Sequence, residues 1–180
     1  MHSNPLDPAV LVIEFILLSV AGLCFKKYRC YLPRKMRKAY IKSITALAAA
    51  VETKDSGTVG HAQRVAELAV GLAKRLGFEG RRLDRIEYAA LLMDMGKANV
   101  PHRLLNKREP LTPEEWKVLQ SHPKLGAEMA AAVPFLEDLA DFVLHHHEYW
   151  DGSGYPDGLR GEEIPLESRI LCVAADYDAM

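Results

Sequence analysis

The chain has 180 residues, 49% of them hydrophobic, a size at which one domain can bury a hydrophobic core. The net charge of -1 conceals an asymmetry, because eight Lys and Arg residues lie within Lys26–Lys42 with no acidic residue among them, and the other 15 face all 24 Asp and Glu residues. A basic segment beside an acidic body favours a membrane surface over nucleic acid as partner. Three scattered cysteines exclude a disulfide framework and a C-x-x-C zinc pattern, and they favour a reducing compartment.

The first element along the chain is an apolar segment, Pro8–Phe25, whose only charged residue is Glu14. Its length approaches the roughly 17–25 residues that span a bilayer core. The basic residues follow the apolar run, whereas in a secretory signal peptide they precede it. The positive-inside rule therefore predicts a single membrane span with the N-terminus outside and the rest in the cytoplasm. The alternatives are a buried core helix and the last of several spans of a longer gene product.

A helix is expected from Arg34 to Thr53, as a connector or as a dimerising stalk. One side of it is apolar and carries Ile41, Ile44, Leu47, Ala48 and Val51. The next helix is expected to begin at a Thr58 cap and to end near Leu76, before Gly77. Its predicted buried stripe consists of Val65, Leu68, Ala69, Leu72 and Leu76.

Further helices follow in the same pattern. Apolar residues recur at helical spacing over Arg82–Met95, and Thr112–Glu115 forms a capping box with proline at the first helical position. Other helices are predicted over about Phe135–His147 and from Leu166 onward, with a loop rich in Gly and Pro, Asp151–Gly161, between them. The sequence contains no convincing strand or repeat, so the predicted class is all-α.

Several polar residues lie where such helices would bury them. His61 shares the apolar face of its helix with Val65, although a single histidine there is more often a core residue with satisfied hydrogen bonds. Asp94 also falls on an apolar stripe, and a buried carboxylate requires a metal, a cation or hydrogen bonds. An ion pair with Lys97 is the simplest account of that residue.

The other candidates are histidines. His122 directly precedes Pro123, at the end of a predicted helix, and indicates little by itself. The run His145–Glu148 follows an apolar helix, where three adjacent histidines are hard to explain by packing, although a solvated run remains an alternative. One Asp and several His from four helices together indicate a metal site for iron, manganese or zinc.

The segment His146–Pro156 reads HHEYWDGSGYP. It resembles the HHExxDGxGYP signature of the HD-GYP family, a branch of the HD metal phosphohydrolases. The resemblance extends from about Glu52 to Met180. It includes the shorter matches ETKD at 52–55, GH at 60–61, DMGK at 94–97, LTPEE at 111–115 and IPL at 164–166.

The resemblance implies an HD-type helical bundle that binds two or three metals, usually iron, and hydrolyses cyclic di-GMP to its linear dinucleotide or to GMP. The metals generate a nucleophile at neutral pH and offset charge on the phosphoryl oxygens. The implied metal ligands are His61, Asp94, His122, His146 and His147. Asp94 would bridge two metals, and Lys97 would face the phosphate, so these two are the catalytic candidates. The implied substrate-binding residues of the loop are Gly152, Gly154, Tyr155 and Pro156, where a tight turn could bring backbone N–H groups close to the ligand.

The sequence departs from the family pattern at two ligand positions. Met93 replaces the histidine of the His-Asp pair, and a thioether is a poor substitute for imidazole on iron or manganese. Ala175 replaces the last ligating aspartate, and the neighbouring Asp176 is displaced by about 100° around a helix. Both losses affect the first metal site, and Gly57 replaces the glutamate of the three-metal members. We therefore expect one or two ions, iron or manganese, and lowered activity.

The predicted organisation is an N-terminal tail and anchor over 1–27, a basic juxtamembrane segment and linker helix over 28–54, and an HD-GYP domain over 55–180. The family's next segment helps to hold the substrate phosphates, and its absence after Met180 suggests a truncated product or a fragment with part of its core uncovered.

The sequence favours a bacterial, single-pass inner-membrane phosphodiesterase of cyclic di-GMP, with the domain in the cytoplasm. The alternative is a catalytically degenerate module that binds cyclic di-GMP or a protein without turnover. A hydrolase of another nucleotide is disfavoured by the GYP loop. Further possible partners are a second copy through the linker helix and a protein through the GYP loop; no nucleic acid is expected.

Overall fold

The computed structural model describes residues 39, 42–55 and 59–180. The chain divides into two units, Met1–Lys42 and Ser43–Met180, and the fold below is that of the second unit. Within the described part of the chain, no helix is long and apolar enough to cross a membrane.

Some predictions fall on residues outside the described ranges. These are the membrane span at Pro8–Phe25, nearly all of the basic segment, the cap at Thr58 and the substitution at Gly57. They remain predictions.

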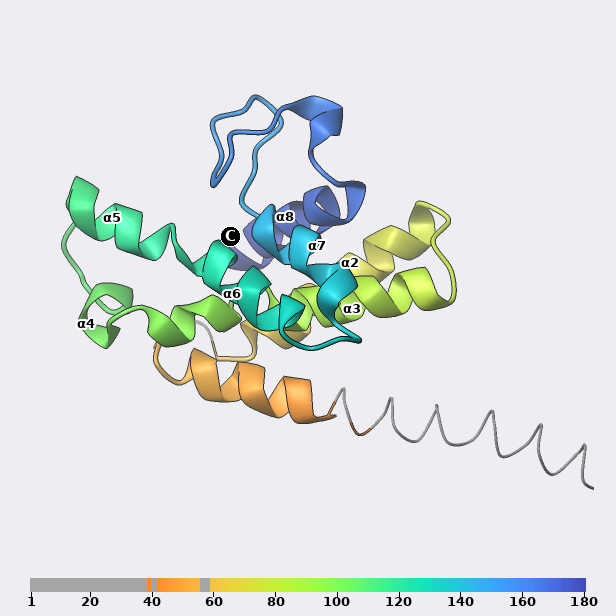
Figure 1. Cartoon of the computed structure of the whole chain (residues 1–180), viewed down its shortest axis with the longest axis horizontal. Helices are drawn as coiled ribbons and strands as arrows, with labels where there is room; N and C mark the ends of the chain where they lie inside the picture. Colours follow the sequence, from red (N-terminus) through yellow and green to blue (C-terminus); the bar gives the residue numbers. More distant parts are fainter. Residues whose placement is uncertain (1–38, 40–41, 56–58) are drawn as a thin grey trace, which may run out of the picture. The chain divides into compact units, whose positions relative to one another are not determined.

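The described residues form helices and loops without a strand, which confirms the all-α class (Figure 1). A helix covers 43–52. It is followed by α2 (His61–Arg75), α3 (Arg81–Leu92), the 3-10 turn η1 (Met95–Asn99), α4 (His102–Leu105), α5 (Pro113–Leu119), α6 (His122–Ala131), η2 (Glu137–Leu139), α7 (Ala140–Leu144), η3 (Gly161–Glu163) and α8 (Leu166–Ala179).

The helices pack in two groups that share one hydrophobic core. Helix α2 packs against α3 and α8, and α6 packs against α7 and η1. Val65 and Ala69 of α2, Ile86 of α3 and Leu171 of α8 are fully buried in this core. The loop between α7 and α8 projects from the bundle, on the side where α8 and α7 lie in Figure 1.

Glycines allow η1 and α6 to approach at backbone distance. A Cβ atom at Gly96 would lie 1.9 Å from the carbonyl oxygen of His122 and 2.8 Å from the amide nitrogen of Gly126. Any larger residue at position 96 would push η1 away from α6. Since Asp94 and Lys97 flank Gly96, this close packing sets their distance from His122.

Several element boundaries differ from the sequence-based predictions. Helix α3 ends at Leu92 rather than at Met95, and the predicted helix over 135–147 is divided into η2 and α7, with His145–His147 in a turn. His122 begins α6 instead of ending a helix, because a proline is tolerated in the first helical turn. Leu76 is 53% exposed and does not belong to the buried stripe of α2.

The junction before α2 is fixed by side chains of the linker. The carboxylate of Glu52 accepts hydrogen bonds from the amides of Gly60 (2.7 Å) and Ala62 (2.6 Å), which belong to the N-terminus of α2. Lys54 donates to the carbonyl oxygens of Ala98 (2.5 Å) and Val100 (3.2 Å). The bonds of Glu52 connect the end of this helix to α2, and those of Lys54 connect the residues after it to the segment that follows Lys97.

Candidate metal centre

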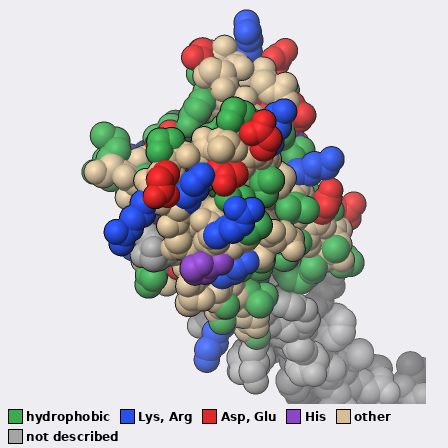
Figure 2. All heavy atoms as spheres, turned by 90° about the vertical axis from the view of Figure 1, so that its left-hand side faces the viewer, with side chains coloured by type: hydrophobic (Ala, Val, Ile, Leu, Met, Phe, Trp, Pro, Cys, Tyr) green, Lys and Arg blue, Asp and Glu red, His purple; other side chains and the backbone are tan. Residues whose placement is uncertain are grey.

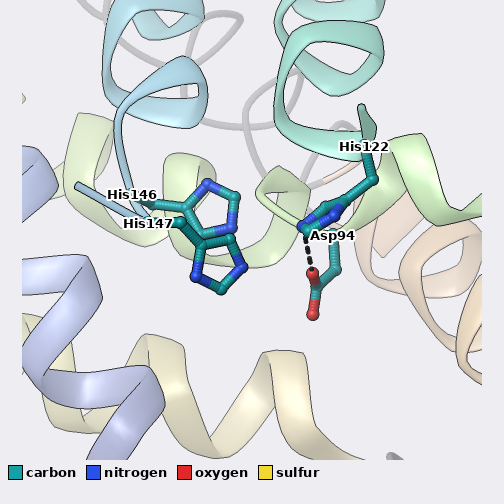
Figure 3. Close-up of side chains that lie close together, drawn as sticks. All are labelled: Asp94, His122, His146 and His147. Atoms are coloured by element: carbon teal, nitrogen blue, oxygen red, sulfur yellow. Dashed lines mark ion pairs between the residues drawn. The ribbon is translucent and has the colours of Figure 1, made fainter. Parts of the chain in front are cut away.

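Four of the five predicted metal ligands lie together. Asp94 follows α3, His122 begins α6, and His146 and His147 follow α7. Each offers one ligand atom, and these atoms all lie within 4.8 Å of one another. In Figure 3 the rings of His146 and His147 lie side by side and face His122 and Asp94. The ring centroid of His122 lies 5.5 Å from that of His146 and 5.1 Å from that of His147.

Backbone carbonyl groups orient two of these imidazoles. Nδ1 of His122 lies 2.7 Å from the carbonyl oxygen of Leu119, and Nδ1 of His146 lies 2.6 Å from that of Val143. A carbonyl oxygen can only accept, so both Nδ1 atoms carry a proton and the Nε2 atoms are the ones left to face a metal. Each Nε2 atom is buried and has no hydrogen-bond partner. Buried polar atoms without a partner are costly, and a metal ion between them would satisfy both.

The pKa values of the histidine pair agree with this arrangement. Burial lowers the pKa of His146 to about 4. Burial, together with the neighbouring His146 and His122, lowers that of His147 to about 2. Both rings are therefore neutral at neutral pH, the form in which imidazole binds a metal.

Asp94 supplies the one carboxylate of the cluster. Its Oδ1 lies 3.3 Å from Nε2 of His122, while its Oδ2 lies 3.0 Å from Nζ of Lys97 and 3.8 Å from Nε2 of His61. Burial opposes ionisation, but the attraction of Lys97 and the contact with His122 outweigh it, so the pKa of Asp94 lies well below its usual range. The carboxylate is therefore ionised, with one oxygen toward the histidine cluster and the other toward His61 and Lys97.

His61 contacts the cluster only through Asp94. Its other ring nitrogen, Nδ1, contacts a residue that the sequence did not predict. Nδ1 of His61 lies 2.8 Å from Oδ2 of Asp178, in the last turn of α8. Arg64 donates to both oxygens of the same carboxylate, at 2.7 and 2.9 Å. Helical spacing offered a signal, because Asp178 lies one turn beyond Ala174, a buried residue of α8.

His145 points away from the cluster, as expected for a residue one position out of register with the histidine pair. Its Nδ1 lies 3.0 Å from the carbonyl oxygen of Asp141, and its Nε2 lies 3.0 Å from Oδ2 of Asp157. It therefore ties the loop after α7 back to that helix.

The loop carrying Gly152, Gly154, Tyr155 and Pro156 is tight. A Cβ atom at Gly154 would lie 2.3 Å from the amide nitrogen of Tyr149 and 2.5 Å from the carbonyl oxygen of His147, and Gly152 has a φ of 79°. The Tyr155–Pro156 peptide bond is cis. The ring of Tyr155 stacks on His147, with centroids 4.8 Å apart, so this part of the loop adjoins the cluster.

Many of the loop's amides bond within the protein, while the predicted role of Gly152, Gly154, Tyr155 and Pro156 in substrate binding stays a prediction. The buried carboxylate of Glu148 accepts hydrogen bonds from the amides of Asp157, Gly158 and Leu159, at 2.7 to 3.1 Å. The amide of Tyr155 donates to the carbonyl oxygen of His147 (3.1 Å). These bonds shape the loop.

The two departures from the family pattern are part of the core. Met93 is 1% exposed, and Ala175 packs against the same core. Asp176 is exposed, and its Oδ2 lies 3.9 Å from Sγ of Cys172. Around Asp94, the described residues that could together hold an ion do not include Asp176.

Comparisons with known proteins agree with the resemblance. The HD domain family model matches residues 45–180. The cyclic di-GMP phosphodiesterase response regulator RpfG of Xanthomonas campestris is 42% identical over 141 residues, which cover 77% of this chain and 37% of that protein. A cyclic di-GMP phosphodiesterase of Thermotoga maritima is 40% identical over 131 residues, 72% of this chain and 36% of that protein. The 3'3'-cGAMP-specific phosphodiesterase 2 of Vibrio cholerae is 35% identical over 171 residues, 94% of this chain and 32% of that protein.

Each match thus spans about a third of the relative's length. Two solved structures share the fold. V-cGAP3, a cyclic GMP-AMP-specific phosphodiesterase of V. cholerae, has a TM-score of 0.61 at 21% identity and covers 77% of this chain and 40% of its own. An HDG"Y"P protein of Bdellovibrio bacteriovorus has a TM-score of 0.55 at 24% identity and covers 64% of this chain and 38% of its own. This chain belongs to the HD domain family, in its HD-GYP branch.

Proposed function

We propose that this chain is a metal-dependent phosphodiesterase that hydrolyses cyclic di-GMP. The observation that carries the proposal is the pair of buried Nε2 atoms of His122 and His146, which lack a hydrogen-bond partner and lie beside His147 and the ionised Asp94. Three imidazoles and a carboxylate suit iron, manganese or zinc. The relatives named for cyclic di-GMP and for 3'3'-cGAMP support a cyclic dinucleotide as substrate.

The residues of the site would have different roles, in metal binding and in attracting the substrate. His122, His146, His147 and Asp94 would hold one ion, and bound divalent metals supply Lewis acidity for phosphoryl transfer. Lys97 balances the charge of Asp94 in the free protein, and its ammonium group would also attract a phosphodiester anion. Asp94 would bridge two ions only if the second ion, beside His61, had further ligands.

A second candidate function is binding without turnover. Met93 and Ala175 remove two ligands from the first site, whose remaining groups, His61 and Asp94, are too few to hold an ion tightly. One ion polarises a phosphate but does not stabilise the attacking and leaving oxygens together, as a metal pair does. We therefore propose slow hydrolysis, and complete loss of turnover would leave a cyclic di-GMP receptor.

The experiment measures metal content and turnover on the same sample. The full chain is purified, loaded with Mn²⁺ or Fe²⁺, desalted and incubated with cyclic di-GMP or with 3'3'-cGAMP, and the products are separated by chromatography. Linear dinucleotide or GMP formed by the metal-loaded protein, and absent in a His122→Gln variant, supports the phosphodiesterase. Tight binding of cyclic di-GMP without products supports the receptor. Absence of both binding and turnover contradicts the proposal.

We also propose that Pro8–Phe25 anchors the domain in a bacterial inner membrane with the domain in the cytoplasm. The support is the apolar run followed by the basic segment. A cysteine introduced at Gly60, in a chain whose own cysteines are replaced by serine, should resist a membrane-impermeant thiol reagent until the cells are opened. Labelling in intact cells would contradict this topology. Dimerisation through the linker helix and a protein partner at the GYP loop remain further proposals.

A further inference from the structure

Two aromatic side chains lie between the cluster of Asp94, His122, His146 and His147 and the surface. The ring of Tyr155 stacks on His147, with an interplanar angle of 24°. The ring of Trp116 contacts Tyr155 edge-on, at a centroid distance of 6.5 Å and an angle of 72°. Trp116 is 46% exposed, so only part of its ring is covered by the protein. Trp116 thus presents an exposed aromatic surface two ring contacts from the histidine cluster.

Helix α5 holds Trp116 firmly in this place. The Thr112 side chain accepts a hydrogen bond from the amide of Glu115, and the Glu115 carboxylate accepts one from the amide of Thr112. The same carboxylate pairs with Lys107 at 2.5 Å and lies 3.8 Å from Arg103 of α4. Trp116 is the next residue after this anchor, so its backbone position is well defined.

The helices around Trp116 carry exposed basic residues. In Figure 1, α4 and α5 lie at the left of the bundle, and Figure 2 shows Lys and Arg side chains on that face with Asp and Glu side chains among them. Arg103 and Lys117 are exposed basic residues of these two helices. Such charges raise the local concentration of a nucleotide.

We propose that Trp116 stacks on a purine base of a cyclic dinucleotide whose phosphate lies at the metal cluster. The inference rests on the proposed function and adds a base-binding residue to it. The base and the phosphate of a nucleotide are joined through one ribose, so they lie close together. Trp116 and His147 are also close, because only the ring of Tyr155 separates them. Base stacking on an exposed aromatic ring is tolerant of sequence, so both guanine and adenine would be accepted.

The other tryptophan provides a matched control. Trp150 is more exposed, at 62%, but its ring packs near the guanidinium of Arg169 (5.6 Å) and beside Gly161. It makes no aromatic contact with Tyr155 or His147 among the ring contacts of the described residues. The chain contains only these two tryptophans, so each can be observed alone by fluorescence.

The test uses the full chain loaded with Zn²⁺, which is redox-inactive. In the Trp150→Phe variant, where Trp116 is the only tryptophan, cyclic di-GMP should quench the fluorescence saturably. In the Trp116→Phe variant, where Trp150 remains, quenching should be weak. Equilibrium dialysis should show cyclic di-GMP binding weakened about 10-fold or more by Trp116→Ala, the loss expected for one stacked base. Trp116→Phe should retain most of the affinity, and Trp150→Ala should change it little.

The outcomes separate this inference from the proposed function. Unchanged affinity in Trp116→Ala, with unaltered metal content and thermal stability, overturns the stacking role while the phosphodiesterase proposal stands. Equal quenching of both tryptophans also overturns it. Failure of the unmodified chain to bind cyclic di-GMP overturns both proposals together.

Discussion

Nδ1 of His61 lies 2.8 Å from Oδ2 of Asp178, although 117 positions separate the two residues in the sequence. The hydrogen bonds from Arg64 and from His61 lower the pKa of Asp178, so its carboxylate is ionised and accepts a hydrogen bond from Nδ1–H of His61. Nε2 of His61 faces Oδ2 of Asp94, at 3.8 Å. Carboxylates that orient metal-binding histidines in this way tune both the tautomer and the ligand strength.

The Asp178→Asn variant should disturb the tautomer of His61. An amide can offer Nδ1 an N–H donor as well as an oxygen acceptor, so the Nδ1–H form loses its electrostatic preference. Long-range ¹H–¹⁵N spectra of the histidine rings, recorded with and without metal, identify the protonated nitrogen directly. Asp176→Asn is the matched control, because Asp176 is an exposed acid of the same helix and should leave the His61 spectrum unchanged. An unaltered His61 tautomer in Asp178→Asn would rule out this role.

The adjacent histidines His145 and His146 should differ in their effect on metal content. His146→Gln removes a buried ligand atom, and we expect the chain to lose metal affinity about 10-fold or more, since the replacement carries no imidazole. His145→Gln should retain the metal, because both nitrogens of His145 bond to residues of the loop and of α7. Metal analysis after dialysis against graded chelator concentrations checks both variants. Equal metal loss in the two would contradict the assignment.

The sequence predicted the all-α class, the capping box of α5 and the helix α8, because these depend on local periodicity and capping. Through the resemblance it also predicted the four side chains that converge at the cluster, together with His61, which does not join them directly. Helix ends were less predictable. The helix expected up to His147 stops at Leu144, since the turn that follows is fixed by the carboxylate of Glu148 and the loop beyond it.

Contacts between segments that are distant in the sequence could not be predicted from the local sequence pattern. Glu52 bonds to the amide of Gly60 at the start of α2, and Asp178 reaches His61 across two packed helices. Likewise, the contact between Trp116 and Tyr155 depends on how α5 and the loop after α7 meet in space. These relationships arise from tertiary packing, which periodicity does not encode.

The pKa values of His146 and His147 predict how the metal-free protein responds to acid. Burial lowers both values, so between the unperturbed pKa of 6.5 and about 4 the unfolded chain binds protons that the folded chain does not. The free energy of unfolding should therefore fall as the pH drops through this window, by on the order of 1 kcal/mol per pH unit for each histidine. Urea unfolding of chelator-treated protein across the window measures the slope. A His146→Gln variant should show a shallower slope, and a flat profile in the unmodified protein would contradict the prediction.

Glu148 should stabilise the loop after α7. Its side chain is 2% exposed and accepts hydrogen bonds from three consecutive amides, Asp157 to Leu159. Glu148→Gln replaces one acceptor with a donor that faces those amides, and should lower the free energy of unfolding by on the order of 3 kcal/mol. Limited proteolysis should then cut within 151–160. The exposed Glu162 provides the control, since Glu162→Gln should resist cleavage like the unmodified chain.

Restoring the family ligands should allow a second metal ion to bind, and should lower the free energy of unfolding of the metal-free protein. Met93 is buried in the core, so Met93→His together with Ala175→Asp places two polar groups there. Without metal, the double variant should unfold more easily than the unmodified chain, by on the order of 2 kcal/mol or more. With Mn²⁺ in excess it should regain stability, by about 2.7 kcal/mol at a concentration 100 times the dissociation constant. Thermal unfolding with and without Mn²⁺, metal analysis and the cyclic di-GMP assay measure the three consequences. A metal-dependent gain in stability beyond that of the unmodified chain, with a second ion and faster hydrolysis, is expected. Two ions and rapid hydrolysis already present in the unmodified chain would show that Met93 and Ala175 do not weaken the first site.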